Sequence, residues 1–507
     1  VRSLRIWLFL RTGFLVAAKE GIFWKIGSAP NEMSESMCPE QFPEIRCRDH
    51  DRCAEQIYSW CPARPAVSTD MASDKFRFPT LTAVVIANMV GTGVFTSLGF
   101  QLLDIRSGFA LLALWAIGGV AALCGAMTYG ELGAALPRSG GEYNLLSRIY
   151  HPAAGFVSGW VSSTVGFSGP VALAAMTFAA YASSIFPEGL SENFQKLLAA
   201  ALLILLTGVH ATNHKNSSGT QVIFTLLKIG VILAFVLGTL IAVDTPQPVS
   251  FLPAEGDFAT ITSGAYAVAL IYVSFAYTGW NAATYLSSEL EDPQRTLPWI
   301  LISGTAVVTL LYLGLNFSFL YAAPMDLLAG QVEVGAIAAQ AAFGETAGRL
   351  TGLILAMLLI STVSAMTMAG PRVIQVIGED YPAIGILGRK NRSRIPATAI
   401  WIQSSVALLF ILSSTFESVL VFSGFTLALN SFVTIAGIFV LRYRQPDLER
   451  PYRTFLYPLP PLLYLLLTGW ILGFTLISRP VEGLFSLGFI GAGLIFYWLA
   501  ANRLSAH

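Results

Sequence analysis

The chain has 507 residues, of which 54% are hydrophobic and only 12% are charged, and its mean hydropathy is +0.64. A soluble protein carries about twice that share of charge, so the composition indicates a polytopic membrane protein. Lysine and arginine together number 30, as do aspartate and glutamate, and this balance excludes the strongly basic surface typical of a nucleic-acid-binding protein.

The first seventy residues differ from the rest of the chain. Charged residues such as Arg5 and Arg11 interrupt their short apolar stretches, so we expect neither a signal peptide nor a membrane span there. Met71 precedes a short basic stretch and the first strong apolar segment. We predict that residues 1–75 are an N-terminal extension, either disordered or upstream of a true start at Met71, and that residues 76–503 form one membrane domain. The cysteines of the extension have spacings that fit no CxxC metal pattern, so we expect no metal site: Cys38, Cys47, Cys53 and Cys61.

Twelve apolar segments of spanning length follow from residue 79 onward. They cover roughly 79–101, 108–136, 153–186, 194–212, 219–243, 260–288, 297–323, 345–378, 396–413, 416–441, 456–477 and 482–502. When the segments alternate in direction, sixteen basic residues fall on the side of Lys75, against four on the other side, which are Arg106, Lys196, Arg349 and Arg479. This bias predicts that both termini are cytoplasmic, and we expect a plasma-membrane protein, such as one of the bacterial inner membrane.

Glycines interrupt two of these segments near the middle of the membrane. The first segment contains Gly91, Thr92 and Gly93, and the sixth contains Gly279. Each glycine alone would also fit close helix packing. Matching positions five segments apart are typical of two five-helix inverted repeats with discontinuous helices, and we favour that interpretation.

An interrupted helix exposes backbone groups that need partners in lipid. The amides at the start of the second half of helix one suit a carboxylate, whereas the last carbonyls of the first halves of helices one and six suit an ammonium group. The first segment has no charged residue, and the sixth has none before Glu289. We therefore predict that the zwitterionic backbone of an amino acid satisfies the interrupted helices.

Lys228 lies about ten residues into the fifth segment. A charged side chain at that depth costs several kcal/mol. Lys228 either snorkels to the interface or faces a polar cavity as part of an ion or proton path, and we favour the cavity.

The sequence resembles the amino acid–polyamine–organocation (APC) superfamily, and within it the L-amino-acid transporter-like permeases. The motifs that carry the resemblance are "VGTGVF" (90–95), "YGELGAALPRSGGEYNLL" (129–146), "FTLLK" (224–228), "FAYTGWNAATYLSSELEDPQRTLP" (275–298) and "GPRVIQVIGED" (370–380). The resemblance implies an all-α polytopic transporter domain over 76–503. It has twelve transmembrane helices, a five-plus-five inverted repeat with discontinuous helices 1 and 6, and two peripheral helices.

The resemblance also implies roles for individual residues. The substrate-binding residues are Met89, Gly91, Thr92, Gly93, Phe275, Ala276, Thr278 and Asn281. Among them, Thr92 and Gly93 would meet the substrate carboxylate, and the carbonyls of Met89, Phe275, Ala276 and Thr278 would meet its ammonium group. Phe275 would form an aromatic lid, and Asn281 would support binding. Lys228 would stand at a sodium site of sodium-coupled relatives, tie helix one to helix eight near Ser361 or Ser364, and carry a coupled proton; Glu131 would anchor the cytoplasmic gate.

These expectations favour a sodium-independent secondary transporter of neutral L-amino acids that works by exchange or proton coupling. Span three offers no acidic residue to the pocket, which disfavours cationic substrates. An amino acid exporter and a polyamine permease are the alternatives, and a non-transporting amino acid sensor is a third. An enzyme is not expected, because the spans contain no HExxH or GxSxG motif, and no cofactor is expected. The loop "FPEGLSENFQ" after the third segment has no cysteine, so we expect no disulfide-linked partner subunit.

Overall fold

The structure is a computed structural model that describes residues 78–138, 140–186, 188–212, 218–391 and 395–504. The predicted N-terminal extension and its four cysteines lie outside the described residues. Within the described part of the chain, every regular element is a helix. The fold discussed below therefore lies almost entirely within the domain predicted over 76–503.

The helices follow one another closely along the chain. In order, they are α3 (Phe78–Met89), α4 (Gly93–Asp104), α5 (Gly108–Ala135), α6 (Gly141–Ile149), α7 (Pro152–Val161), the π-turn η2 (Ser162–Gly166), α8 (Phe167–Ser183), α9 (Glu192–Thr212), α10 (Ser218–Ala242), α11 (Asp257–Ile261), α12 (Gly264–Ala276), the 3₁₀ segment η3 (Ala282–Glu289), α13 (Pro293–Ala322), α14 (Met325–Leu328), α15 (Val334–Phe343), α16 (Glu345–Asp380), the 3₁₀ segment η4 (Pro382–Gly388), α17 (Ala397–Ser413), α18 (Phe416–Arg444), α19 (Leu459–Ser478) and α20 (Pro480–Leu504).

Nine helical stretches of the described chain are long and apolar enough to cross a membrane, counting 81–104 and 152–183 as one each. Shorter apolar helices cover 226–242, 264–276, 334–343 and 397–413. The described chain is thus an all-α polytopic membrane protein. The sixth predicted segment is not one helix, because it is divided among α11, α12 and η3.

Several helices begin at a residue whose side chain caps them. The hydroxyls of Ser107, Ser263 and Thr415 accept hydrogen bonds from the amides of Ala110, Tyr266 and Ser418, three residues further along the chain. Such caps satisfy amides that the first turn of a helix leaves without partners. They fix where α5, α12 and α18 begin.

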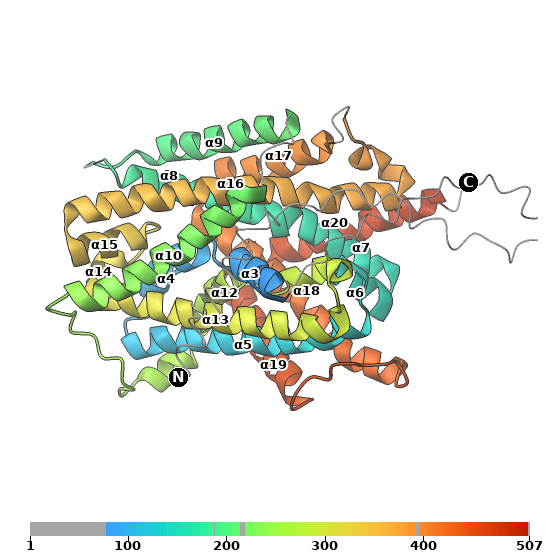
Figure 1. The fold of residues 1–507 in the computed structure, drawn as a ribbon, viewed down its shortest axis with the longest axis horizontal. Helices are drawn as coiled ribbons and strands as arrows, with labels where there is room; N and C mark the ends of the chain where they lie inside the picture. The colour runs from blue at the N-terminus through green and yellow to red at the C-terminus, as the bar shows by residue number, and fades with distance from the viewer. Residues whose placement is uncertain (1–77, 139, 187, 213–217, 392–394, 505–507) are drawn as a thin grey trace, which may run out of the picture. The chain divides into compact units, whose positions relative to one another are not determined.

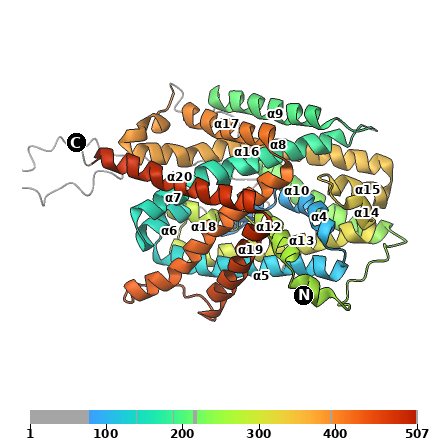
Figure 2. The same cartoon turned by 180° about the vertical axis from the view of Figure 1, so that it is seen from behind.

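Two groups of long helices enclose the interrupted ones. Figures 1 and 2 both show α5 beside α13, and α8, α9, α16 and α17 together on the other side of α3, α4 and α12. The helices α4 and α12 pack on each other, and α3 packs on α13. The interrupted helices therefore lie in the interior of the bundle, where their free backbone groups are shielded from lipid.

Candidate substrate-binding site

The first helical segment is interrupted between α3 and α4. The amide of Val90 still bonds the carbonyl of Ile86 at 2.9 Å, but the amide of Gly91 turns back to the carbonyl of Met89 at 2.8 Å. Regular helix resumes at Gly93. Thr92 is buried and its side chain does not cap α4. The amide of Phe95 donates to the carbonyl of Thr92 at 3.0 Å, which leaves the amides of Gly93 and Val94 for an external acceptor.

The sixth segment is interrupted after Ala276. The chain turns through Tyr277–Asn281 before η3 begins, and Gly279 has a φ of 99°. Only glycine adopts this left-handed conformation readily. A Cβ atom at Gly279 would also lie 2.9 Å from the carbonyl carbon of Asn88 in α3, so the turn packs directly on the first segment.

The two interruptions lie against each other. A Cβ atom built on Gly93 would lie 2.6 Å from the Cα atom of Ala276 and 2.7 Å from its Cβ atom. A Cβ atom at Gly91 would meet nothing closer than the Met89 carbonyl oxygen at 3.9 Å. Gly93 therefore permits the backbones of α4 and α12 to touch, whereas Gly91 lies in a roomier part of the site.

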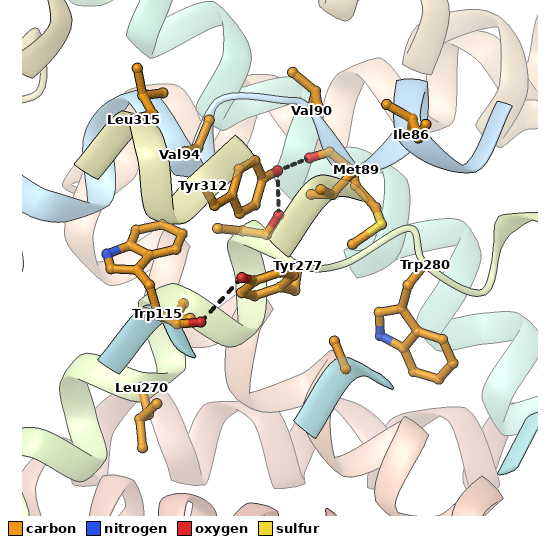
Figure 3. Close-up of a cluster of buried hydrophobic side chains, with 14 of the residues drawn as sticks. Ile86, Met89, Val90, Val94, Trp115, Leu270, Tyr277, Trp280, Tyr312 and Leu315 are labelled. Carbon is orange, nitrogen blue, oxygen red and sulfur yellow. Dashed lines mark hydrogen bonds between the residues drawn. The ribbon is translucent and has the colours of Figure 1, made fainter. Parts of the chain in front are cut away.

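Tyr312 of α13 joins the two interrupted helices, as Figure 3 shows. Its hydroxyl lies 2.6 Å from the carbonyl oxygen of Met89 and 3.0 Å from that of Ala276. A tyrosine hydroxyl has a single proton to donate, so the two carbonyls share it. Tyr312 is fully buried and was not among the predicted site residues.

Three of the four carbonyls predicted to meet an ammonium group, those of Met89, Phe275 and Ala276, already have donors in this structure. Besides Tyr312, the amide of Gly91 donates to Met89, and both the amide and the hydroxyl of Thr278 donate to the carbonyl of Phe275, at 3.0 and 2.7 Å. A carbonyl oxygen has two lone pairs. The carbonyl of Ala276 therefore keeps acceptor capacity beside Tyr312, while those of Met89 and Phe275 each serve two donors.

Lys228 is buried and its ammonium group donates to the hydroxyl of Thr362 in α16 at 2.7 Å. The two residues line one small cavity with Gly91 and Phe95. The structure thus places Lys228 inside the helix bundle, between the first interruption and α16. Its partner Thr362 was not named from the sequence, although it follows the predicted Ser361.

The two predicted serines, Ser361 and Ser364, both lie in α16, and each has an interaction. Ser361 is buried and has an interaction partner. The hydroxyl of Ser364 lies 2.8 Å from Nε2 of His210 in α9. Ser364 therefore links α16 to α9.

Glu131, near the end of α5, is fully buried and ion-paired. Its carboxylate accepts two hydrogen bonds from the guanidinium group of Arg442 in α18, at 2.8 and 2.7 Å, and one from the amide of Thr454 at 2.7 Å. The guanidinium group of Arg442 also lies 3.5 Å from the ring centroid of Tyr457. Glu131 thus joins α5 to the end of α18 and to the loop that follows it.

Phe275 and Asn281 lie at the two ends of the second interruption along the chain. Phe275 is buried beside Gly424 of α18. The side-chain amide of Asn281 donates to the carboxylate of Glu142 at 3.0 Å. Asn281 is therefore engaged by a neighbouring acidic residue.

A second cavity lies on the side of the interruption that faces α18 and α19. Its lining includes Ser274, Thr278, Leu427 and Ser431. None of its lining residues is an aspartate, glutamate, lysine or arginine. The cavity therefore offers hydroxyl groups and apolar surface to whatever enters it.

Sequence reasoning missed Tyr312, Thr362 and Glu142. Tyr312 and Thr362 are uncharged polar residues within apolar helices, and Thr362 directly follows the predicted Ser361. Glu142 lies in the quoted motif "SGGEYNLL", and two adjacent glycines before an acid were a signal of a sharp turn that could have identified it.

Comparisons with known proteins match this architecture to transporters. The amino acid permease family model covers residues 76–499. The b(0,+)-type amino acid transporter 1 of Mus musculus is 28% identical over 426 residues, covering 82% of this chain and 85% of the relative. The large neutral amino acids transporter small subunit 2 of Homo sapiens is 30% identical over 435 residues, covering 82% of this chain and 78% of the relative. The chain therefore belongs to the amino acid permease family of the APC superfamily.

Proposed function

We propose that this permease is a sodium-independent secondary transporter of neutral L-amino acids that works by alternating access, through exchange or proton coupling. The observation that carries the proposal is the contact between the two helix interruptions at Gly93 and Ala276. Helix amides and carbonyls converge there without a charged side chain from either interrupted segment. This is the chemistry that a zwitterion completes.

The proposed architecture is twelve spans in a five-plus-five inverted repeat, with α19 and α20 peripheral. The pairing of helices supports it, because each helix packs on its counterpart five spans later: α4 on α12, α5 on α13, α8 on α16 and α9 on α17. The fifth pair of counterparts is α10 and α18, which make equivalent contacts: α10 contacts α13 and α16, and α18 contacts their counterparts α5 and α8. The charge bias of the loops supports cytoplasmic termini in a plasma membrane.

In this proposal the substrate carboxylate binds at Thr92 and the amide of Gly93, beside Gly91. The ammonium group binds at the carbonyls of Ala276 and Thr278 and shares the carbonyls of Met89 and Phe275 by displacing their present donors. Phe275 closes over the substrate. Asn281 supports the site indirectly through its bond to Glu142.

The cavity next to α18 and α19 supports a neutral side chain as the cargo, because its lining carries no charge. A charged substrate side chain would be buried there without a partner, at a large cost in free energy. The name of one human relative specifies large neutral amino acids, which agrees with this choice. The loop after α8 has no cysteine, and we propose that no disulfide-linked subunit is needed.

Lys228 takes the role of a fixed or protonatable cation beside the first interruption. Its ammonium group occupies the cavity next to Gly91, so it supplies a positive charge without a bound sodium ion. Glu131, through Arg442, holds the cytoplasmic end of α5 to α18 as an anchor of the gate on that side.

Uptake into proteoliposomes tests the proposal. The purified chain would be assayed in sodium-free buffer with labelled neutral, cationic and acidic amino acids and with a diamine. Each substrate would be tried with empty and with amino-acid-loaded vesicles, with and without an inward proton gradient. Saturable uptake of neutral amino acids alone is expected. Transport of the diamine alone would favour a polyamine permease, efflux without uptake an exporter, and binding without transport a sensor.

A further inference from the structure

Glu142 is a buried carboxylate whose own ionisation the proposed function does not use. It occupies the first turn of α6 and is only 4% exposed. Gly140 and Gly141 precede it with φ values of 117° and 53°, a conformation that favours glycine. A Cβ atom at Gly141 would lie 2.6 Å from the ring of Tyr285. The chain therefore turns tightly against the second interrupted helix and directs Glu142 inward.

Five uncharged donors surround this carboxylate, and we call the group the Glu142 cluster. Its donors are the hydroxyl of Tyr129 at 2.6 Å, the side-chain amides of Asn430 at 2.6 Å and Asn281 at 3.0 Å, and the hydroxyls of Tyr285 and Ser431 at 3.4 Å. They come from α5, from the chain around η3 and from α18. An ionised carboxylate only accepts hydrogen bonds, so this arrangement fits the ionised form.

No cation pairs with Glu142 among the described residues. The titratable groups that face it are phenols: Tyr129 of α5, Tyr285 of η3 and Tyr464 of α19. The sequence of α7, which packs on α6, contains no titratable residue.

The cationic residues of α18 are engaged elsewhere. Arg442 bonds Glu131, and Arg444 bonds the Ile149 carbonyl at the opposite end of α6. Burial raises the pKa of Glu142 above its usual value, and the hydrogen bonds from the cluster lower it only in part. Because phenols have an ordinary pKa of about 10, Glu142 is the member of its cluster that titrates in acid.

Protonation would change what holds the cluster together. A neutral carboxyl group donates one hydrogen bond and accepts fewer, so it cannot satisfy five donors at once. Charge-assisted hydrogen bonds are roughly twice as strong as neutral ones. Protonation therefore weakens the hydrogen bonds to Glu142 from Asn281, next to the second interruption, and from Asn430 of α18. The helix α18 also carries Arg442, which bonds Glu131.

We propose that Glu142 is a second ionisable coupling residue, separate from Lys228. Its ionised form holds η3 and α18 to α6. Its protonation releases them, so that the side of the transporter that carries the Glu142 cluster opens. The inference rests on the proposed transport function. Proton binding at Glu142 shifts the equilibrium between the closed and open forms of the transporter, because the donors of the cluster bond the ionised carboxylate more strongly than the neutral carboxyl group.

The test compares Glu142→Gln with the unaltered chain in proteoliposomes. Uptake of a neutral amino acid would be measured from external pH 5 to 8, with homo-exchange measured in parallel. The protonated fraction of one group changes about tenfold per pH unit above its pKa, so the unaltered chain should show a steep dependence. Glu142→Gln should keep saturable exchange and vary less than about twofold over the same range.

Two further variants, one test and one control, allow the proposal to be checked if Glu142→Gln fails to fold. Asn430→Ala removes a 2.6 Å donor from the ionised carboxylate, so the midpoint of the pH profile should move to higher pH, a shift that a purely structural role would not produce. Glu345→Gln alters an exposed carboxylate paired with Arg349 and should leave the profile unchanged.

The outcomes separate the two proposals. If no amino acid is transported at any pH, the proposed function itself is wrong. If transport occurs but is independent of pH from 5 to 8, or if the profiles of Glu142→Gln and Asn430→Ala both coincide with that of the unaltered chain, this inference is overturned and the proposed function stands.

Discussion

Replacing Gly93 by alanine tests the contact on which the site depends. The new Cβ atom would lie 2.6 Å from the Cα atom of Ala276, whereas carbon atoms in contact are ordinarily about 3.5–4.0 Å apart. The helices α4 and α12 must therefore separate by about 1 Å to accept a single methyl group. Because the near atoms belong to backbone as well as side chain, a rotamer change cannot relieve the overlap.

The magnitude follows from the packing. Adding a methyl group to a closely packed contact typically costs about 1–3 kcal/mol of stability. A displacement of about 1 Å in a binding geometry costs roughly a hundredfold in rate. We therefore expect Gly93→Ala to insert into membranes, to unfold at a lower temperature, and to lose about two orders of magnitude of uptake.

The assay pairs proteoliposome uptake with thermal unfolding in detergent. Gly473→Ala is the matched control, because this glycine lies within α19 and a Cβ atom added there would have no neighbouring atom within 4 Å. That variant should transport normally and be as stable as the unaltered chain or slightly more stable. If Gly93→Ala transports like Gly473→Ala, then the two interruptions do not form the site and the reasoning fails.

Three further substitutions address the supports of the site. Gly279→Ala should lower the unfolding temperature, because a φ of 99° costs alanine about 1–2 kcal/mol and its Cβ would lie 2.9 Å from Asn88; unchanged thermal unfolding would contradict this. Thr362→Val removes the acceptor of Lys228 and should lower the stability of the folded protein by about 1–3 kcal/mol. Net uptake should fall and Thr362→Ser should restore it; normal uptake by the valine variant would exclude a coupling role for this bond. Tyr312→Phe removes the hydroxyl shared by Met89 and Ala276 and should raise the KM for substrate and lower stability by about 1–3 kcal/mol; the absence of both changes would show that other donors replace it.

The sequence was informative at residues that are unfavourable within a membrane-spanning helix. Glycines in mid-span predicted interruptions at 91–93 and near 275–281, and the structure has non-helical backbone at 90–92 and 277–281. A lysine deep in an apolar segment predicted a buried cation, and Lys228 is buried against α16. These features are visible from the sequence because lipid tolerates neither an open backbone nor an unpaired charge.

The partners of these residues could not be read in the same way. Thr362 accepts a hydrogen bond from Lys228 because the rotation of α16 turns its hydroxyl toward α10, and that rotation depends on packing along the whole helix. Tyr312 reaches two carbonyls that are 223 and 36 residues away in sequence. Such contacts arise from the crossing of α13 with α3 and α12, which no local pattern specifies.

Gly93 has a packing role in the structure that the sequence did not indicate. The sequence marked it as a residue that lets a carboxylate approach the backbone. The structure shows that it also lets α4 approach Ala276. Both roles require the absence of a side chain, so the sequence alone cannot separate substrate access from helix packing.

The most direct measurement for the central claim is competition by altered substrates. Uptake of a labelled neutral L-amino acid would be measured in the presence of the unlabelled amino acid, its methyl ester, which lacks the carboxylate, and its N-acetyl derivative, which lacks the ammonium group. The account predicts competition by the intact zwitterion alone, because the amides of α4 and the carbonyls at the end of α12 each need their own charged group. Equal competition by either derivative would contradict the claim that the interrupted helices bind the amino acid backbone.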